Sequence, residues 1–130
     1  MTGAVPKIQR LTKRSEFLAC AKAPSTAKGA IVVQARPRDD DAALVRVGFT
    51  ATKRIGGAVE RNRAKRRMRE AARALLPDFA APGIDYVIIA RGGVLTRPWP
   101  RLLDDVKTAL LRLAPESDRR PPATAPSPQV

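Results

Sequence analysis

Three stretches of the chain have the hydrophobic patterns of β-strands. Between Leu44 and Thr52 apolar side chains alternate with polar or small ones, which predicts a strand with one buried and one polar face. Between Asp85 and Arg91 the apolar residues form a continuous run, which is typical of a central strand covered on both faces. The stretch 30–36 is short, partly β-branched and closed by Pro37, so we predict a further strand there.

A spacing of three to four residues between apolar positions predicts three helices. The first runs from an N-cap at Thr12 to about Lys22. The second runs from about Ala58 to Leu76, and Pro77 ends it. The third follows Pro98, with Pro100 near its first turn. Its helical spacing is carried by Leu103, Val106, Leu110 and Leu113.

The predicted elements follow one another as α, β, β, α, β, α, with a further short strand near Ile55. This order predicts an α+β fold, a sheet packed with helices, in a single domain over residues 11–114. We interpret residues 1–10 as a flexible arm and residues 115–130, which hold five of the twelve prolines, as a disordered tail. We interpret the acidic triplet 39–41 as a solvated turn rather than a metal site.

The composition narrows the chemistry that the domain can perform. The 130 residues include 25 Lys and Arg against 12 Asp and Glu, a net charge of +13, and a field of this sign attracts nucleic acids. The absence of histidine excludes a histidine-based active site, and the one cysteine, Cys20, can form neither an internal disulfide nor a zinc cluster. No apolar run approaches the about 20 residues of a membrane helix, so we expect a soluble, cytoplasmic protein.

The charge is concentrated in residues 53–73, which hold nine Lys and Arg against two Glu. A helical projection gives the second helix an apolar stripe and an arginine-rich opposite side. The stripe holds Ala64, Met68, Ala71 and Leu75, and the opposite side holds Asn62, Arg66, Arg69 and Arg73, with Arg63 on its flank. A solvated helix surface would pair such cations with carboxylates, which are almost lacking here. The pattern therefore favours a surface for nucleic-acid phosphates.

RNA fits this arrangement better than DNA. A basic helix could enter the major groove of DNA, but a helix packed on a sheet beside a polar strand face better suits a cleft for a single strand. Aromatic residues make up only 4% of the chain, so extensive base stacking is not expected. Phe17, Tyr86 and Trp99 are the candidates for stacking, and for Tyr86 and Trp99 a place in the core is favoured.

From Arg46 to Glu70 the chain reads RVGFTATKRIGGAVERNRAKRRMRE. The diagnostic part is Arg61, Asn62 and Arg63 followed by Lys65 and Arg66, preceded by Lys53, Arg54, Ile55 and Gly56. This stretch closely resembles the bacterial ribonuclease P protein subunit family, and the resemblance extends over roughly residues 8–113. It implies an α, β, β, β, α, β, α fold with an unusual left-handed β-α-β crossover around the arginine-rich helix.

The resemblance also implies a non-catalytic protein subunit of an endoribonuclease. In the family the catalytic RNA subunit holds Mg²⁺ and removes the 5′ leader of precursor tRNA, which gives the mature tRNA 5′ end. The protein binds that RNA and grips the leader in a cleft between the first helix and the sheet. No catalytic residue, bound metal, membrane or DNA partner is then expected of the protein itself, and the lack of histidine and of a convincing acidic metal site agrees with this.

The resemblance implies two sets of binding residues. Those for the RNA subunit are Lys53, Arg54, Arg61, Asn62, Arg63, Lys65, Arg66, Arg69 and Arg73. Those for the leader are Phe17, Arg46, Thr50 and Thr52. Phe17 could equally be a core residue that holds the first helix to the sheet. Family members often carry further aromatics where this chain has Ala21 and Gln34, which implies fewer stacking side chains in the cleft.

Three other functions share part of this pattern. A general basic RNA-binding or ribosomal protein would carry the same charge, and a DNA-binding helix module would carry a similar helix. A stand-alone nuclease is the catalytic alternative, but the sequence lacks the acid–base and metal-binding residues that it would need.

Overall fold

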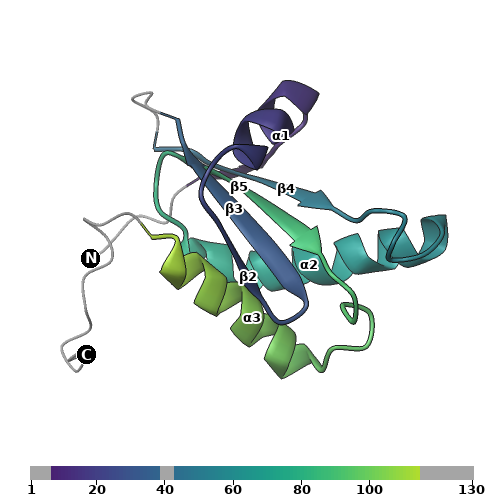
Figure 1. The fold of residues 1–130 in the computed structure, drawn as a ribbon. Helices are drawn as coiled ribbons and strands as arrows, with labels where there is room; N and C mark the ends of the chain where they lie inside the picture. Colours follow the sequence, from purple (N-terminus) through teal and green to yellow (C-terminus); the bar gives the residue numbers. More distant parts are fainter. Residues whose placement is uncertain (1–6, 39–42, 115–130) are drawn as a thin grey trace.

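Helices cover both faces of a five-stranded sheet (Figure 1). The computed structural model describes residues 7–38 and 43–114. In chain order the elements are β1 (Ile8–Arg10), α1 (Arg14–Ala21), β2 (Ser25–Lys28), β3 (Ile31–Pro37), β4 (Val45–Thr50), α2 (Ala58–Phe79), β5 (Ile84–Ala90) and α3 (Trp99–Arg112). Helix α1 lies on one face of the sheet, and α2 and α3 pack together on the other. The predicted α+β class and single domain are confirmed.

The strands are ordered β1-β4-β5-β3-β2 across the sheet. Strand β5 is central, as its continuous apolar run predicted, and it pairs parallel to β4 and antiparallel to β3. Strand β1 pairs parallel to β4 at one edge, and β2 forms a hairpin with β3 at the other. Helix α2 makes the crossover between the neighbouring parallel strands β4 and β5, while the left-handed sense of that crossover stays a prediction.

The alternation along β4 sorts its side chains between the two faces. Val45 and Val47 are buried in the core beneath α2 and α3, whereas Arg46, Gly48 and Thr50 occupy the alternate positions, which face α1. The predicted stripe of α2 packs against the first set: Ala64, Met68 and Ala71 are fully buried, and Leu75 is partly buried.

A smaller apolar cluster lies beneath α1. It contains Leu11, Cys20 and Val87, with Phe17 and Ile89 packed against it. Helix α1 has only eight residues, so it covers part of its sheet face. The remaining positions on that face are half-exposed: Val32 and Gln34 on β3, Thr50 on β4 and Ile89 on β5.

Two short edge strands were not predicted from the residue pattern, although the order of elements from α1 to α3 is the α, β, β, β, α, β, α that the resemblance implied. Ile8–Arg10, which belong to the predicted flexible arm, form β1, and Ser25–Lys28 form β2. Neither segment has a hydrophobic period, and each is extended because it pairs with a neighbouring strand. The short strand predicted near Ile55 is wrong: Ile55 lies in the turn between β4 and α2.

Two helix ends differ from the prediction. The N-cap of α1 is Lys13 rather than Thr12. Helix α2 continues through Pro77 to Phe79, although proline removes one backbone hydrogen bond from a helix. The added turn packs Phe79 against the core, where the Lys107 ammonium lies 5.2 Å from the ring centroid. This packing offsets the loss of the hydrogen bond at Pro77.

Three predictions lie wholly or partly outside the described residues, namely residues 1–6 of the flexible arm, the acidic turn at 39–41 and the tail 115–130. Within the described residues, no helix combines the length and the apolar character that crossing a membrane requires.

Candidate nucleic-acid interface

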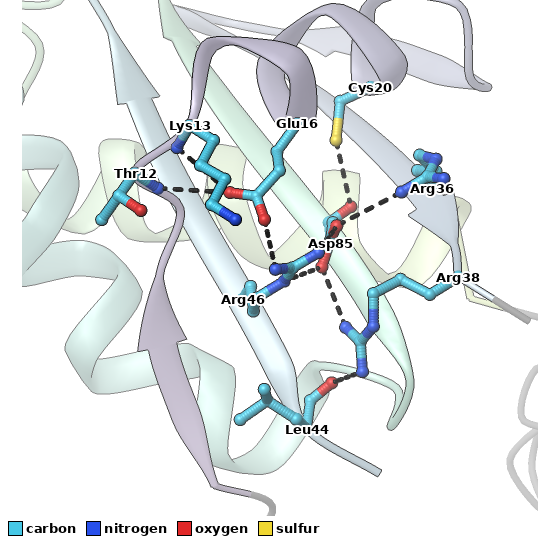
Figure 2. A network of polar contacts seen from close by, with 9 residues as sticks. All are labelled: Thr12, Lys13, Glu16, Cys20, Arg36, Arg38, Leu44, Arg46 and Asp85. Atoms are coloured by element: carbon cyan, nitrogen blue, oxygen red, sulfur yellow. Dashed lines mark hydrogen bonds and ion pairs between the residues drawn. The ribbon is translucent and has the colours of Figure 1, made fainter. Parts of the chain in front are cut away.

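A buried carboxylate joins three strands to α1 (Figure 2). Asp85 of β5 is fully buried. Arg46 of β4 donates hydrogen bonds of 2.8 and 2.7 Å from Nε and Nη2 to its two oxygens. Arg38 donates a further one of 2.9 Å, and Arg36 of β3 lies 3.5 Å away. The third nitrogen of Arg46, Nη1, binds Glu16 of α1. The network therefore runs from the centre of the sheet to the helix above it.

The network keeps both partners charged. Burial raises the pKa of Asp85, but the hydrogen bonds from Arg46 and Arg38 outweigh it, and the pKa lies below its ordinary value. Hydrogen bonding to Asp85 raises the pKa of Arg46 in turn. All three guanidinium nitrogens of Arg46 are thus engaged by carboxylates. Arg46 was predicted to bind the leader, and that contact stays a prediction; in the structure its guanidinium connects β4 and β5 to α1 through Asp85 and Glu16.

Glu16 both starts and anchors α1. Its Oε1 accepts hydrogen bonds of 3.1 and 3.4 Å from the backbone N–H groups of Lys13 and Thr12, which have no partner within the helix. Burial raises the pKa of Glu16, but these hydrogen bonds and the charge of Arg46 together outweigh it, so the pKa lies below its ordinary value. One carboxylate therefore fixes the position of the helix that carries the next residue, Phe17.

The ring of Phe17 lies directly on the backbone of β4. A Cβ at Gly48 would stand 2.5 Å from two ring carbons of Phe17 and 3.2 Å from the Cβ of Leu11, so only glycine allows this approach. Phe17 is half-exposed, with one part packed on the cluster beneath α1. The structure therefore supports a packing role for Phe17 and leaves part of its ring open to a ligand.

A pocket opens where the parallel strands β4 and β5 end, which we call the strand-end pocket. Functional residues gather at the carboxyl ends of neighbouring parallel strands. Ile89 lines this pocket and also packs beneath α1, so the open sheet face continues into it. The pocket measures about 640 Å³ and is lined by Thr52, Lys53, Arg54, Ile55, Ile89, Ala90, Arg91 and Gly92.

A second concave surface follows the exposed side of α2, and we call it the α2 groove. It is about 540 Å³ in volume and is lined by Val59, Asn62, Arg63, Arg66 and Arg69. Val59 is 66% exposed, which leaves an apolar side chain beside a row of guanidiniums. Four of the predicted RNA-subunit residues thus lie together.

The other predicted RNA-subunit residues are distributed differently. Lys53 and Arg54 are exposed and belong to the strand-end pocket. Arg61 donates a 3.3 Å hydrogen bond to the carbonyl of Gly56 and supports the start of α2. Lys65 is half-exposed and lines neither surface. Arg73 is exposed further along α2, 4.0 Å from Glu70.

Arg67 shows that not every arginine of α2 faces solvent. It donates hydrogen bonds of 2.7 Å to the carbonyls of Val94 and Arg97, and its guanidinium lies 5.9 Å from the ring centroid of Trp99. It therefore ties α2 to the loop before α3. Trp99 remains 39% exposed, whereas Tyr86 is fully buried, with its hydroxyl accepting a 2.9 Å hydrogen bond from the N–H of Ala81. The favoured core role holds for Tyr86.

Sequence reasoning missed Arg91 as a candidate. Arg91 follows β5 directly and lines the strand-end pocket with Lys53 and Arg54. Its position after a predicted central strand was a usable signal, because basic residues that follow two parallel strands meet at one edge. The pairing of β4 with β5 is what turns that position into a shared pocket.

The two buried carboxylates of the described residues are engaged by arginines and a backbone N–H. Asp85 is surrounded by arginines, and the other buried carboxylate, Asp105, accepts hydrogen bonds of 2.9 Å from Nε and Nη2 of Arg97 and one of 3.0 Å from the N–H of Ala30. In residues 7–38 and 43–114 no group of three or more His, Cys, Asp or Glu could hold a metal ion. Burial raises the pKa of Cys20 to about 11, so its thiol is not a reactive nucleophile at neutral pH.

The comparisons with known proteins agree with this geometry. The family model described as Ribonuclease P matches residues 5–114. The chain is 66% identical over 113 residues to the "Ribonuclease P protein component" of Caulobacter vibrioides (strain NA1000 / CB15N). This match covers 87% of this chain and 76% of the relative. It is 53% identical over 108 residues to the protein of the same name from Ruegeria pomeroyi, and this match covers 82% of this chain and 86% of the relative.

Solved structures share the fold. The RNase P protein from Thermotoga maritima matches with a TM-score of 0.68 at 24% identity, over 82% of this chain and 98% of that one. The Staphylococcus aureus RNase P protein matches with a TM-score of 0.65 at 24% identity, over 78% of this chain and 91% of that one. The matched family model and the identities to curated relatives establish that the chain belongs to the bacterial ribonuclease P protein family, whose members are protein components of a tRNA-processing enzyme.

Proposed function

We propose that the protein binds the catalytic RNA subunit of ribonuclease P through the α2 groove and binds the 5′ leader of precursor tRNA on the sheet face beside α1. The observation that carries this proposal is the separation of two basic concave surfaces, which lie on α2 and at the ends of β4 and β5. Two surfaces allow one small protein to hold two RNA segments at once.

The α2 groove suits a structured RNA backbone. Arg63 and Arg66 are exposed and line it together with Asn62. No carboxylate lines the groove, so its guanidiniums remain available for bidentate contacts with phosphates. Arg61 and Lys65 flank the groove on the same helix.

The sheet face beside α1 suits a single strand. Phe17 offers part of a ring for stacking, and Thr50 offers a hydroxyl for hydrogen bonding to a nucleotide. The strand-end pocket continues this surface with Thr52, Lys53 and Arg91. Gln34 is half-exposed on the same face, beside β5, so the cleft would combine one aromatic contact with several polar ones.

The cleavage chemistry would belong to the RNA. The carboxylates Asp85 and Asp105 are engaged by arginines, and the chain has no histidine. We therefore assign Mg²⁺ to the RNA subunit, and we assign to the protein the binding and orientation of the leader.

Reconstitution tests this function. We expect nuclease-treated protein alone to leave precursor tRNA intact, because the chain has no histidine and its described residues hold no metal-binding cluster. Addition of the cognate RNA subunit and Mg²⁺ should give cleavage at the mature 5′ end. Cleavage at that position by RNA-free protein would contradict the assignment. Recovery of ribosomes rather than one large structured RNA with the tagged protein would instead favour the general RNA-binding alternative.

A further inference from the structure

A third concave surface lies at the β1 edge of the sheet, on the same face as α2. We call it the β1 pocket. Its floor is apolar, because Val47 and Leu76 are buried there and Ile8 and Phe49 pack beside them. Three arginines, one from β1 and two from α2, also line it. The pocket has a volume of about 410 Å³ and is lined by Ile8, Arg10, Val47, Phe49, Arg69, Ala72, Arg73, Leu76 and Pro77.

The charge of this pocket is not balanced by the residues that line it. Arg10, Arg69 and Arg73 contribute three guanidiniums, and none of the lining residues is a carboxylate. Glu70 approaches Arg73 only to 4.0 Å, and both side chains are largely exposed. The Nε of Arg69 is buried and has no hydrogen-bond partner within the described part of the chain. A buried donor of this kind is costly unless an acceptor arrives.

Arg69 connects this pocket to the α2 groove, because its side chain lines both. A phosphate backbone that follows the groove therefore reaches the edge of the β1 pocket without leaving the arginine surface. We propose that the β1 pocket receives one unstacked nucleotide of the RNA subunit, with its base on the apolar floor and its adjoining phosphates on Arg10 and Arg69. This inference rests on the proposed function and deepens it.

A nucleotide matches both halves of the site. A free phosphate would satisfy the guanidiniums but leave the apolar surface of Ile8 and Phe49 uncovered. An apolar peptide would cover the floor but leave three cations without counter-charge. RNA-binding proteins commonly read unstacked bases through apolar or aromatic contacts combined with arginines on the backbone.

Methyl NMR of the full-length protein tests whether a base enters. The protein, labelled at Ile, Leu and Val methyl groups, is observed free and bound to the RNA subunit. We expect the signals of Ile8, Val47 and Leu76 to shift on binding, while those of Leu110, a buried residue on α3, stay in place. Unchanged signals at Ile8, Val47 and Leu76 in a complex that has formed would refute the proposal.

Two further observations identify the occupant. If the three methyl signals shift only when precursor tRNA is added, the pocket takes a substrate nucleotide and the assignment to the RNA subunit is wrong. If the free protein shows nuclear Overhauser contacts from Val5 to Val47 and Leu76, the chain's own N-terminal segment fills the pocket, and the proposal is also wrong.

Substitution of the arginines gives an independent measurement. Arg10→Ala should lower the slope of log affinity for the RNA subunit against log salt by ~0.7 to 0.9, the value for one phosphate contact. Arg101→Ala is the matched control, because Arg101 is exposed on α3 and lines none of these surfaces. An equal slope in Arg10→Ala and Arg101→Ala would exclude the phosphate contact. If Arg10→Ala leaves the slope unchanged while Arg63→Ala lowers it, the proposal for the β1 pocket is wrong and the proposed function of the α2 groove stands.

Discussion

Residues of one type serve different purposes in this molecule. The guanidinium of Arg46 donates its hydrogen bonds to Asp85 and Glu16, and that of Arg67 donates to two backbone carbonyls. Arg63 and Arg66 have exposed side chains that line a groove. Charge density in the sequence indicates that the protein binds a polyanion, but which arginine binds it depends on the acceptors that the fold places nearby.

Phe17 and Gly48 provide a test at the residue scale. Phe17→Ala should cost less stability than the ~3 to 5 kcal/mol of a fully buried phenylalanine, because the ring is half-exposed. It should weaken holoenzyme binding of precursor tRNA by ~1 to 3 kcal/mol if one base stacks on the ring, with mature tRNA unaffected. Thermal melting and the two affinities measure these effects. A large fall in melting temperature with an unchanged preference for the precursor would assign Phe17 to packing alone.

The same pair of residues predicts non-additive behaviour. Gly48→Ala should displace the Phe17 ring, because its new Cβ would overlap two ring carbons. In the double variant Phe17→Ala, Gly48→Ala that overlap is gone, so the combined loss of stability should be smaller than the sum of the single losses. Additive losses in thermal or denaturant unfolding would mean that the two residues do not touch.

At the scale of the element, α2 uses its sides for separate tasks. One side packs Met68 and its neighbours into the core, and another carries the arginines of the α2 groove. Between them Arg67 reaches the loop before α3. A single helix can combine these tasks because residues one position apart point about 100° apart around its axis.

Adjacent arginines of α2 should therefore differ in their effects. Arg66→Ala should lower the salt dependence of RNA-subunit binding by ~0.7 to 0.9 for each phosphate that the guanidinium binds, with thermal stability nearly unchanged. Arg67→Ala should cost ~1 to 3 kcal/mol of stability, because it leaves two carbonyls without their donor, and should keep the slope. Affinity titrations at several salt concentrations, paired with melting curves, measure both. A smaller slope in Arg67→Ala together with an unchanged slope in Arg66→Ala would mean that the α2 groove is not the docking surface.

At the scale of the whole molecule, Asp85 holds separate elements together. It joins β3, β4 and β5 through arginines and reaches α1 through Arg46 and Glu16. At the other end of the fold, Asp105 of α3 joins the β2–β3 turn at Ala30 to Arg97. The two buried carboxylates therefore fix the helices on both faces relative to one sheet.

This arrangement predicts an acid-sensitive fold. The folded pKa of Asp85 lies below its ordinary value, so its stabilising contribution is fully present above about pH 4 and is lost as the pH falls through the folded pKa. Asp85→Asn should cost ~3 to 5 kcal/mol, since it leaves the buried side chain of Arg38 and the partly buried one of Arg46 facing a neutral amide. It should also flatten the dependence of unfolding free energy on pH below about 4.

Denaturant unfolding between about pH 2 and about pH 7 provides this measurement. Asp104→Asn is the control, because the side chain of Asp104 is 64% exposed and lies 3.8 Å from Lys28. A pH dependence in Asp85→Asn as steep as in the unaltered protein would show that another group controls acid unfolding. Glu16 and Asp105 also have lowered pKa values, so some dependence should remain.

The sequence by itself determined the elements whose pattern is carried by their own residues. The alternation in β4, the apolar run in β5 and the stripe of α2 were readable because each reflects which faces of the element are buried: one face for β4 and α2, and both faces for β5. The motif from Arg61 to Arg66 also indicated the family before any fold was known. The strands β1 and β2 could not be predicted in this way, because their extended form depends on hydrogen bonds to neighbouring strands.

Only the tertiary structure decided which polar residues are free to bind RNA. Arg46 alternates with buried valines and looked like a side chain on an open strand face, yet Asp85 lies opposite it in the register of β4 with β5. Arg91 and Arg10 joined the candidate surfaces only through the pairing of their strands. A charged side chain is neutralised or left available by the groups within a few ångströms of it, and in this fold many of those groups come from distant parts of the chain.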